Sequence, residues 1–409
     1  MKRIVGRDSG MREAKMSCRK STKTSTLKPT PSLRAARQGG VGRQRWLITL
    51  FFSTTLWPLL TSPAAAQFAR LYSIENGDVY LRRPNWSDFY RTQPRTMLTG
   101  DDALIVEGDA STRVTLLCPN GSQQLWTTGV GQAANVGSTC FGTPRWFRPS
   151  FGVSNTWHAT DATEPYVISP WAGQVLTTTP HLRWNAVEGA SGYSVGLLHK
   201  DSEGWTEMWT VNTTHSSINY PRDEAALELG EEYALQVTVT GEPKGAEESS
   251  VIFGAISGPP RRAAEAEIAE IDALPIDRAM KVVRLVEEVY PTSDLYAEGI
   301  NDLTALINDG METAQIQRLL GDYFVRSGLV IPAEESYLAA LSLAEMEENI
   351  EEEATAAWGI GTVYGRVGRE EEARVYLEQG LAIAKELGDE DLAASIEKEL
   401  DRLTTAQEL

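Results

Sequence analysis

Few residue types in this sequence could carry out chemistry, and its histidines and cysteines do not stand at spacings known for catalysis or metal binding. The four histidines lack the i,i+4 spacing that places two ring nitrogens on one helix face for zinc. They are His158, His181, His199 and His215. The chain also has no phosphate-binding glycine loop and no Cys-x-x-Cys pair. We therefore predict a protein that is not an enzyme and uses no cofactor or metal.

Charge is distributed unevenly along the 409 residues. Residues 1–66 hold 13 basic and two acidic side chains, whereas the rest of the chain holds 25 basic and 54 acidic ones, a net charge of −29. Such a field repels phosphates and anionic lipids, so we predict no nucleic-acid partner. The acidic run Glu347–Glu353 is predicted to be a solvated helical face, because calcium would need Asp or Asn at alternate loop positions.

The basic N-terminal segment is predicted to be a secretory signal. It precedes the apolar stretch Trp46–Leu60 and the small-residue site Ala64–Ala66, which is the order that export signals follow. We expect cleavage after Ala66 and a mature protein in the periplasm or outside the cell. Contact with a membrane is expected only through residues 1–66, if they are not removed.

The cysteines predict one disulfide bond. Cys18 lies in the signal segment, which leaves Cys118 and Cys140 as an even pair in an oxidising compartment. The alternative is a pair of reduced thiols in a hydrophobic core.

Residues 67–150 have the pattern of a small β module. Segments such as Asp78–Arg82 and Arg113–Cys118 alternate apolar and polar residues and are separated by Asn-Gly and Gly-Asp turns. The run Leu98–Val106, followed by Ala110–Ser122, resembles the core of the FecR-type periplasmic β module. That resemblance implies an all-β fold, and no binding role is carried over from it.

A second β segment spans residues 165–256. Its stretches Pro180–Val195 and Leu229–Val237 resemble a fibronectin type III or related immunoglobulin-like sandwich. Trp184 on an early strand and Tyr233 near the start of a late strand are the core markers of that fold.

The C-terminal part has a helical repeat. Residues 257–264, which contain Gly-Pro-Pro, are predicted to be a linker, and apolar residues recur at helical spacing over residues 265–409. Leu320-Gly321-x-x-Phe324 realigns with Ile360-Gly361-x-x-Tyr364 at an offset of 40 residues, and the alanine and aromatic positions after each motif realign as well.

This pattern resembles the tetratricopeptide repeat, in a 40-residue variant similar to kinesin light chain repeats. The resemblance implies an α-helical solenoid that binds a protein or peptide in its concave groove. It assigns to that groove Arg318, Asp322, Arg326, Trp358, Thr362 and Arg366. Guanidinium groups pair with carboxylates, so an acidic peptide is one expected ligand. The alternative is that these arginines neutralise neighbouring glutamates and bind no partner.

The sequence thus predicts a multidomain chain in which two small all-β modules precede an α-helical solenoid. The arrangement resembles exported cyanobacterial proteins that join the same modules, and it predicts a non-enzymatic interaction scaffold. The alternative is a carbohydrate- or cell-wall-binding protein, because eight tryptophans fall between Trp86 and Trp209. Exposed tryptophans on one sheet face would favour sugar binding, whereas burial of most of them would favour the scaffold.

Overall fold

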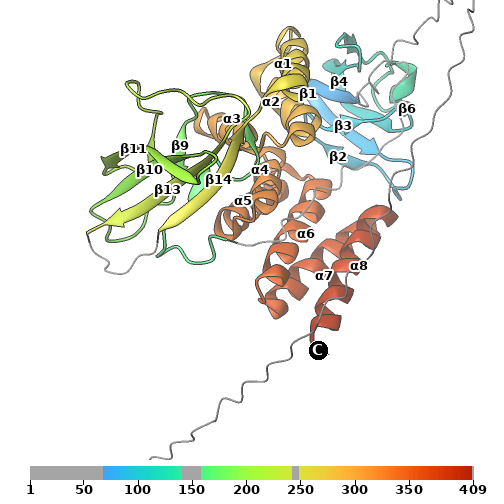
Figure 1. Cartoon of the computed structure of the whole chain (residues 1–409). Coiled ribbons are helices and arrows are strands. Elements are labelled where there is room, and N and C mark those ends of the chain that lie inside the picture. Colours follow the sequence, from blue (N-terminus) through green and yellow to red (C-terminus); the bar gives the residue numbers. More distant parts are fainter. Residues whose placement is uncertain (1–67, 141–157, 242–247, 408–409) are drawn as a thin grey trace, which may run out of the picture. The chain divides into compact units, whose positions relative to one another are not determined.

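The computed structural model of the protein describes residues 68–140, 158–241 and 248–407 (Figure 1). The predicted signal, residues 1–66, lies outside the described residues, as does the predicted boundary at residue 150. Strands come first along the chain and helices follow, which confirms the predicted β-then-α fold class. In the described part of the chain, no helix is both long and apolar enough to span a membrane.

The β module, residues 68–140, is a six-stranded sheet built around two long antiparallel strands. These strands are β1 (Ala69–Arg82) and β4 (Ala103–Leu117). Shorter elements complete the module: β2 (Tyr90–Thr92), β3 (Met97–Leu98), β5 (Gln123–Leu125), β6 (Ala134–Asn135) and the 3-10 turn η1 (Val136–Ser138). Alternate residues of β1 and β4 point into a core of their own, as the period of a half-buried strand requires. Cys118 and Cys140 are bonded in this core, with Cα atoms 5.3 Å apart, as predicted.

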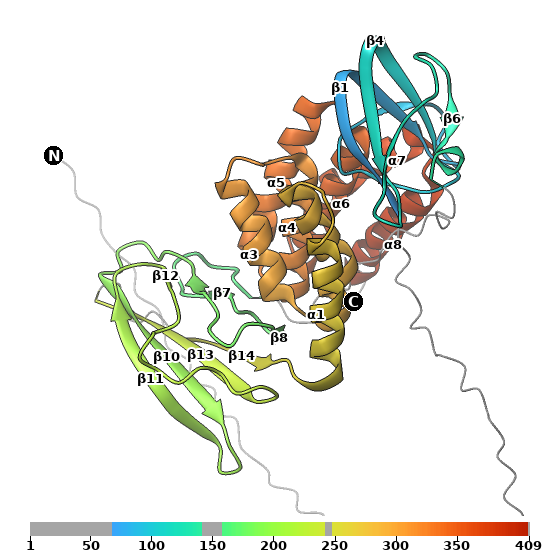
Figure 2. The ribbon, with the colours of Figure 1, turned by 90° about the horizontal axis from the view of Figure 1, so that it is seen from above.

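The second β region is a sandwich of two sheets (Figure 2). One sheet has the strand order β11-β10-β13-β14-β8 and the other the order β12-β9-β7. Their bounds are β7 (Val167–Ser169), β8 (Gln174–Val175), β9 (Leu182–Trp184), β10 (Gly192–Lys200), β11 (Trp205–Thr213), β12 (Ser217–Ile218), β13 (Glu232–Thr240) and β14 (Ser249–Ala255). Trp184 of one sheet packs edge-on against Tyr193 of the other, with ring centroids 5.5 Å apart. The hydroxyl of Tyr233 accepts a hydrogen bond from the Glu228 amide at 2.7 Å, as a tyrosine corner does.

The helical part begins earlier than predicted. Helix α1 starts at Gly258, directly after the last strand, so most of the predicted linker at residues 257–264 is helical. Pro259 and Pro260 lie in its first turn, where a helix needs no amide donor. The Gly-Pro-Pro sequence that predicted a linker therefore forms the first turn of a helix.

The helical part as a whole forms antiparallel helix pairs and a final helix (Figure 1). In order they are α1 (Gly258–Asp272), α2 (Arg278–Arg284), the π-helical turn η2 (Leu285–Val289), η3 (Tyr290–Ser293), α3 (Tyr296–Asn308), α4 (Ala314–Ser327), α5 (Val330–Glu347), α6 (Ile350–Arg366), α7 (Glu370–Leu387) and α8 (Glu390–Gln407).

The realigned glycines mark the close contacts inside these pairs. A Cβ atom at Gly321 would lie 2.8 Å from the ring of Tyr337 on α5. A Cβ atom at Gly361 would lie 2.5 Å from Leu377 on α7. The repeat therefore keeps glycine where the first helix of each pair touches the second.

Candidate functional site

The inner face of the repeat helices lines a cavity of about 140 Å³. Four of the six predicted groove residues contribute to its wall, namely Arg318, Asp322, Trp358 and Thr362. Arg326 and Arg366 lie outside that wall. The structure therefore places four of these residues on one cavity wall of α4 and α6. The repeat alignment did not show how the charges there are paired.

Arg318 and Asp322 form a buried polar network on that face. The Arg318 guanidinium contacts Asp322 at 2.6 Å and Glu352 at 2.5 Å, and the Tyr337 hydroxyl donates to Asp322 at 2.7 Å. Burial alone would lower the pKa of Arg318, but Glu352 and Asp322 raise it overall. Burial raises the pKa of Asp322 above its usual range, even though Arg318 opposes the shift. The guanidinium charge is thus neutralised within the solenoid.

The other predicted arginines also have partners in the solenoid. Arg366 contacts Glu399 of α8 at 3.2 Å, and the Arg326 guanidinium lies 5.5 Å from the ring centroid of Tyr296. Arg318 and Arg366 therefore show the contacts expected of the alternative interpretation, in which arginines neutralise neighbouring glutamates. Partner binding by the six residues stays a prediction.

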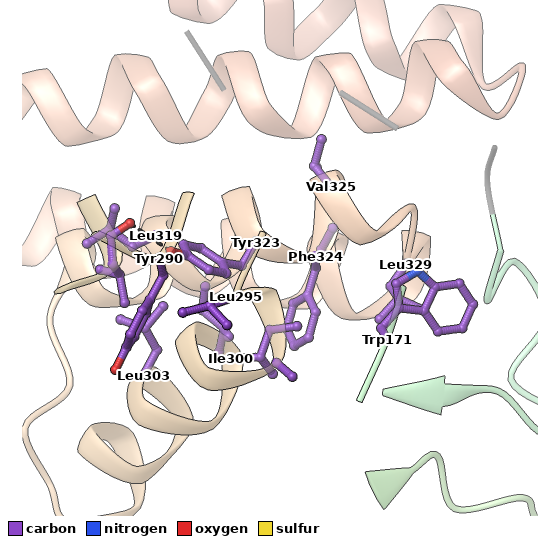
Figure 3. Close-up of a cluster of buried hydrophobic side chains, with 14 of the residues drawn as sticks. Trp171, Tyr290, Leu295, Ile300, Leu303, Leu319, Tyr323, Phe324, Val325 and Leu329 are labelled. Atoms are coloured by element: carbon purple, nitrogen blue, oxygen red, sulfur yellow. Dashed lines mark hydrogen bonds between the residues drawn. The ribbon is translucent and has the colours of Figure 1, made fainter. Parts of the chain in front are cut away.

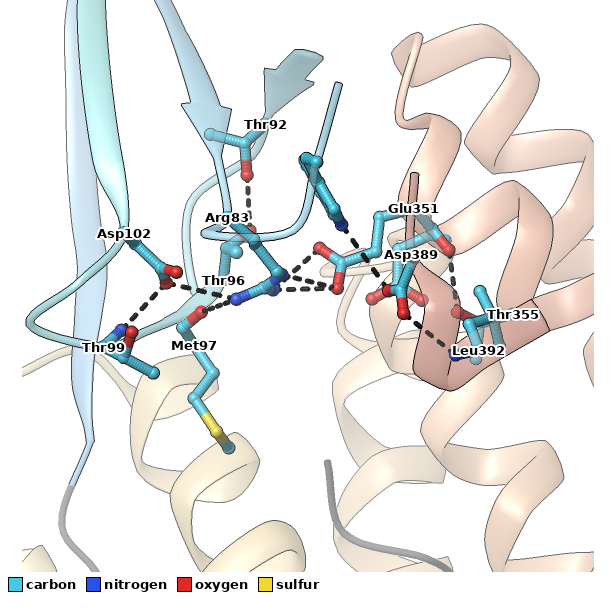
Figure 4. Close-up of polar contacts among 12 residues, drawn as sticks. Arg83, Thr92, Thr96, Met97, Thr99, Asp102, Glu351, Thr355, Asp389 and Leu392 are labelled. Carbon is cyan, nitrogen blue, oxygen red and sulfur yellow. Dashed lines mark hydrogen bonds and ion pairs between the residues drawn. The ribbon is translucent and has the colours of Figure 1, made fainter. Parts of the chain in front are cut away.

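The β module closes one edge of this inner face. Thr96 and Met97 of the module line the cavity, and so does Arg83. Figure 4 shows the Arg83 guanidinium pointing from the module toward Glu351. One of its nitrogens donates to both Glu351 oxygens, at 2.8 and 2.9 Å, and another donates to Asp102 at 3.2 Å.

Glu351 stands in the first turn of α6, where a carboxylate is favoured by the helix dipole. It was predicted to belong to a solvated helical face, as was Glu352. That prediction is wrong for both, because Glu351 binds Arg83 and Glu352 binds Arg318. The error arose because charge patterning within a helix does not show which distant residue folds against it.

Arg70 makes the most deeply buried contact between the β module and the solenoid. Its side chain is fully buried, and it contacts Glu287 at 2.6 Å and Glu288 at 2.8 Å on η2. Burial alone would lower the pKa of Arg70, but the two glutamates raise it overall. Burial would raise the pKa of Glu288, but Arg70 and Arg284 lower it overall. Each charge is thus held in its ionised form by its partners.

Polar contacts continue along the turns between helix pairs. The Ser87 amide donates to the Leu387 carbonyl at 2.6 Å, and the Tyr90 hydroxyl donates to the Glu386 carbonyl at 3.0 Å. Arg91 contacts Glu348, the residue that follows α5, at 2.7 Å. Sequence reasoning missed these residues. The sequence offered one signal for them: arginines are grouped in the module, and several helices of the solenoid begin with acidic residues.

The tryptophans of the β regions are mostly buried. Trp86, Trp126, Trp171, Trp184 and Trp209 are each at most 8% exposed. Trp205 is 39% exposed, and Trp146 and Trp157 lie outside the described residues. Within the residues that the structure describes, no group of three or more His, Cys, Asp and Glu could hold a metal ion.

Comparison with known proteins agrees with the repeat. A family model described as tetratricopeptide repeat matches residues 308–386, which cover α4 to α6 and nearly all of α7. Tetratricopeptide repeats suggest a role in protein–protein interaction. No curated protein matches the sequence.

Among solved structures, a crystal structure of beta-1,2-glucanase from Parabacteroides distasonis aligns with 82% of this chain at 10% identity and a TM-score of 0.19. The alignment covers 48% of that chain, about half its length. At that TM-score it carries no argument about fold or function.

Proposed function

We propose that the protein is an exported, non-enzymatic interaction scaffold whose solenoid binds a protein partner on its inner face. One observation carries this proposal: the edge of that face already holds a folded polypeptide surface. The β module docks there through both ion pairs and bonds to main-chain carbonyls. A surface that holds one polypeptide in this way has the donors, acceptors and shape to hold another.

The ligand chemistry follows from the contacts rather than from the count of arginines. An acidic peptide would have to displace Glu352 and Asp322 from Arg318, or Glu399 from Arg366. Leaving the buried Arg318 without its carboxylates would cost several kcal/mol, roughly 3–5. The Arg366–Glu399 pair is partly exposed and weaker. We therefore assign docking to the inner face as a whole, with Trp358 and Thr362 on the cavity wall as its apolar and hydroxyl contacts.

The test is capture from a cell-envelope extract with the full chain and two matched variants. Thr362→Arg fills the cavity on α6, whereas Thr404→Arg adds the same charge on the exposed face of α8. We expect a specific partner to be retained by wild type and by Thr404→Arg and to be lost by Thr362→Arg. Circular dichroism checks that both variants are folded. A partner retained equally by both variants would contradict docking on the inner face.

Export is tested separately. We propose that mature protein from the native host begins near Gln67, and N-terminal sequencing decides this. An intact N-terminus in the membrane fraction would contradict a cleaved signal.

Sugar binding is the weaker proposal, because burial removes five of the eight tryptophans from any binding platform. Exposed Trp205 already lies 5.8 Å from the Lys200 ammonium. We expect Trp205→Ala to leave retention on immobilised cell-wall polysaccharide unchanged.

A further inference from the structure

We infer that the edge of the solenoid binds arginine-bearing polypeptide surfaces, and that the β module is its resident occupant. We call this surface the acidic edge and define it by Glu287, Glu288, Glu348 and Glu351. The inference rests on the proposed function, since it assigns a charge to the partner of the same solenoid. The partner is a cationic polypeptide, not an acidic one.

The contacts form a graded series. Arg70 is fully buried against two glutamates, the Arg83 side chain is 7% exposed, and the Arg91 side chain is 32% exposed. Bonds from a guanidinium to both oxygens of a carboxylate are strong and directional, and a buried pair resists screening by salt. Arg70 and Arg83 therefore anchor the module, and Arg91 adds a weaker, screened contact.

Main-chain carbonyls of the solenoid also take part in holding the module. The carbonyls of Glu386 and Leu387, at the turn before α8, accept hydrogen bonds from Tyr90 and Ser87. Carboxylates and carbonyls are acceptors only, so a ligand for this edge must bring donors. An arginine-rich segment supplies them, whereas an anionic peptide would face like charges.

The module can leave this edge without losing its own core. Its buried cluster is built from its own strands and includes the disulfide; Leu387 is the one buried solenoid residue in that cluster. Ile350 and Ile383 also pack against that cluster, and a second small cluster joins Leu117 of the module to Ile276 and Met280. A joint with such small apolar contacts beside its ion pairs and hydrogen bonds resembles a transient interface rather than a shared core. A partner carrying the same donors can therefore exchange with the module.

The test uses a labelled peptide of residues 80–97, which contains Arg83 and Arg91, titrated against the full chain by fluorescence anisotropy. In wild type the resident module competes, so the apparent dissociation constant equals the intrinsic one divided by the fraction of open molecules. The double variant Arg70→Ala/Arg91→Ala removes two module contacts and leaves Glu348 and Glu351 in place. We expect this variant to bind the peptide at least about tenfold more tightly than wild type, less so at high salt.

Matched controls make the result specific. The same peptide with Arg83 and Arg91 replaced by Glu should not bind, and replacement of these two by Lys should weaken binding, because an ammonium cannot bridge both oxygens. Adding Glu351→Gln to the double variant should weaken binding of the original peptide several-fold. Equal binding of the Arg and Glu peptides, or no gain in the double variant, would overturn the inference.

A second measurement protects the test if the double variant fails to fold. In wild type, excess peptide should speed hydrogen exchange of the Ser87 amide, which is bonded to Leu387 across the joint. Unchanged protection at saturating peptide would contradict exchange at this edge. If the peptide fails while capture still depends on Thr362, the proposed function stands and the arginine preference is wrong.

Discussion

The sandwich and the β module are joined to the solenoid by different physical means. The sandwich shares one continuous apolar cluster with the helices, in which Trp171 and Leu329 both take part (Figure 3). Main-chain bonds reinforce this joint, since His158 donates to the Gly328 carbonyl at 2.7 Å and its carbonyl accepts from Val330 at 3.0 Å. The sandwich and solenoid should therefore unfold as one unit.

The β module has a core that is mostly its own, with Leu387 as the buried solenoid residue in it. It meets the solenoid through the buried Arg70 and Arg83 and through a small apolar cluster of Leu117, Ile276 and Met280. Apolar burial is not screened by salt and buried ion pairs resist screening, whereas the more exposed pair of Arg91 and Glu348 is screened. The chain therefore has two kinds of joint. The joint of the sandwich is permanent, because it is held by apolar burial, whereas the joint of the β module is sensitive to charge. Such an arrangement allows a docking surface to be exposed without loss of the fold.

The strongest test of the permanent joint is Trp171→Ala. Trp171 is 8% exposed and packs 5.1 Å from the His158 ring, so its removal should lower the free energy of unfolding by about 3–5 kcal/mol. Urea denaturation followed by the helical circular dichroism signal measures this. The control is Trp205→Ala on the exposed side of the same sandwich. Equal effects of the two substitutions would show that sandwich and helices do not share a core.

Reduction of the disulfide should act on the β module alone. The bond between Cys118 and Cys140 closes a loop of 22 residues. Loss of this bond should destabilise the module by about 3 kcal/mol on the chain-entropy model. Hydrogen exchange should accelerate in β4 with reductant while the core of α6 stays protected. Matching acceleration in both elements would mean that the module and the solenoid unfold together.

A carboxyl at the permanent joint should make it sensitive to pH. Glu298 on α3 accepts a bond from the Leu176 amide of the sandwich, and its Oε2 is buried without a hydrogen bond among the described residues. Burial raises the pKa of Glu298 from 4.5 to about 7, with Asp302 adding to the shift and the amides of Leu176 and Thr177 opposing it.

The folded state therefore keeps a proton that the unfolded chain releases. This contribution to stability is complete below about pH 4.5 and is lost as pH rises through about 7. Relative to Glu298→Gln, wild type should lose up to about 3 kcal/mol across that window. Urea titrations of both proteins at several pH values measure the difference, and parallel pH profiles would contradict the assignment.

The smallest effect is expected at the rim of the charged joint. Arg91 contacts Glu348 and Asp78 with partly exposed side chains, so Arg91→Ala should cost about 0–1 kcal/mol. The loss should vanish near 1 M salt, where the screening length is about 3 Å. Arg113→Ala serves as control, because within the described residues Arg113 donates to the nearby Ala110 and Thr112 carbonyls of its own strand. A loss that persists at high salt would mean that Arg91 acts through apolar contacts.

The sequence by itself determined the features that depend on neighbouring residues. Period-two alternation and turn residues predicted the β regions, and the offset of 40 residues predicted the helix pairs around Gly321 and Gly361. Two cysteines in one module predicted the disulfide that the structure contains. Such patterns are local, because strand and helix periods fix which residues share a face.

Tertiary structure alone decided how the charges are used. Arg70 and Glu288 are 218 positions apart, and no spacing rule connects residues on different modules. The same is true of Arg83 and Glu351, so an acidic helix start that was predicted to be solvated became a docking surface. Ion pairs depend on distance in space and on burial, and both are set only when the modules fold against one another.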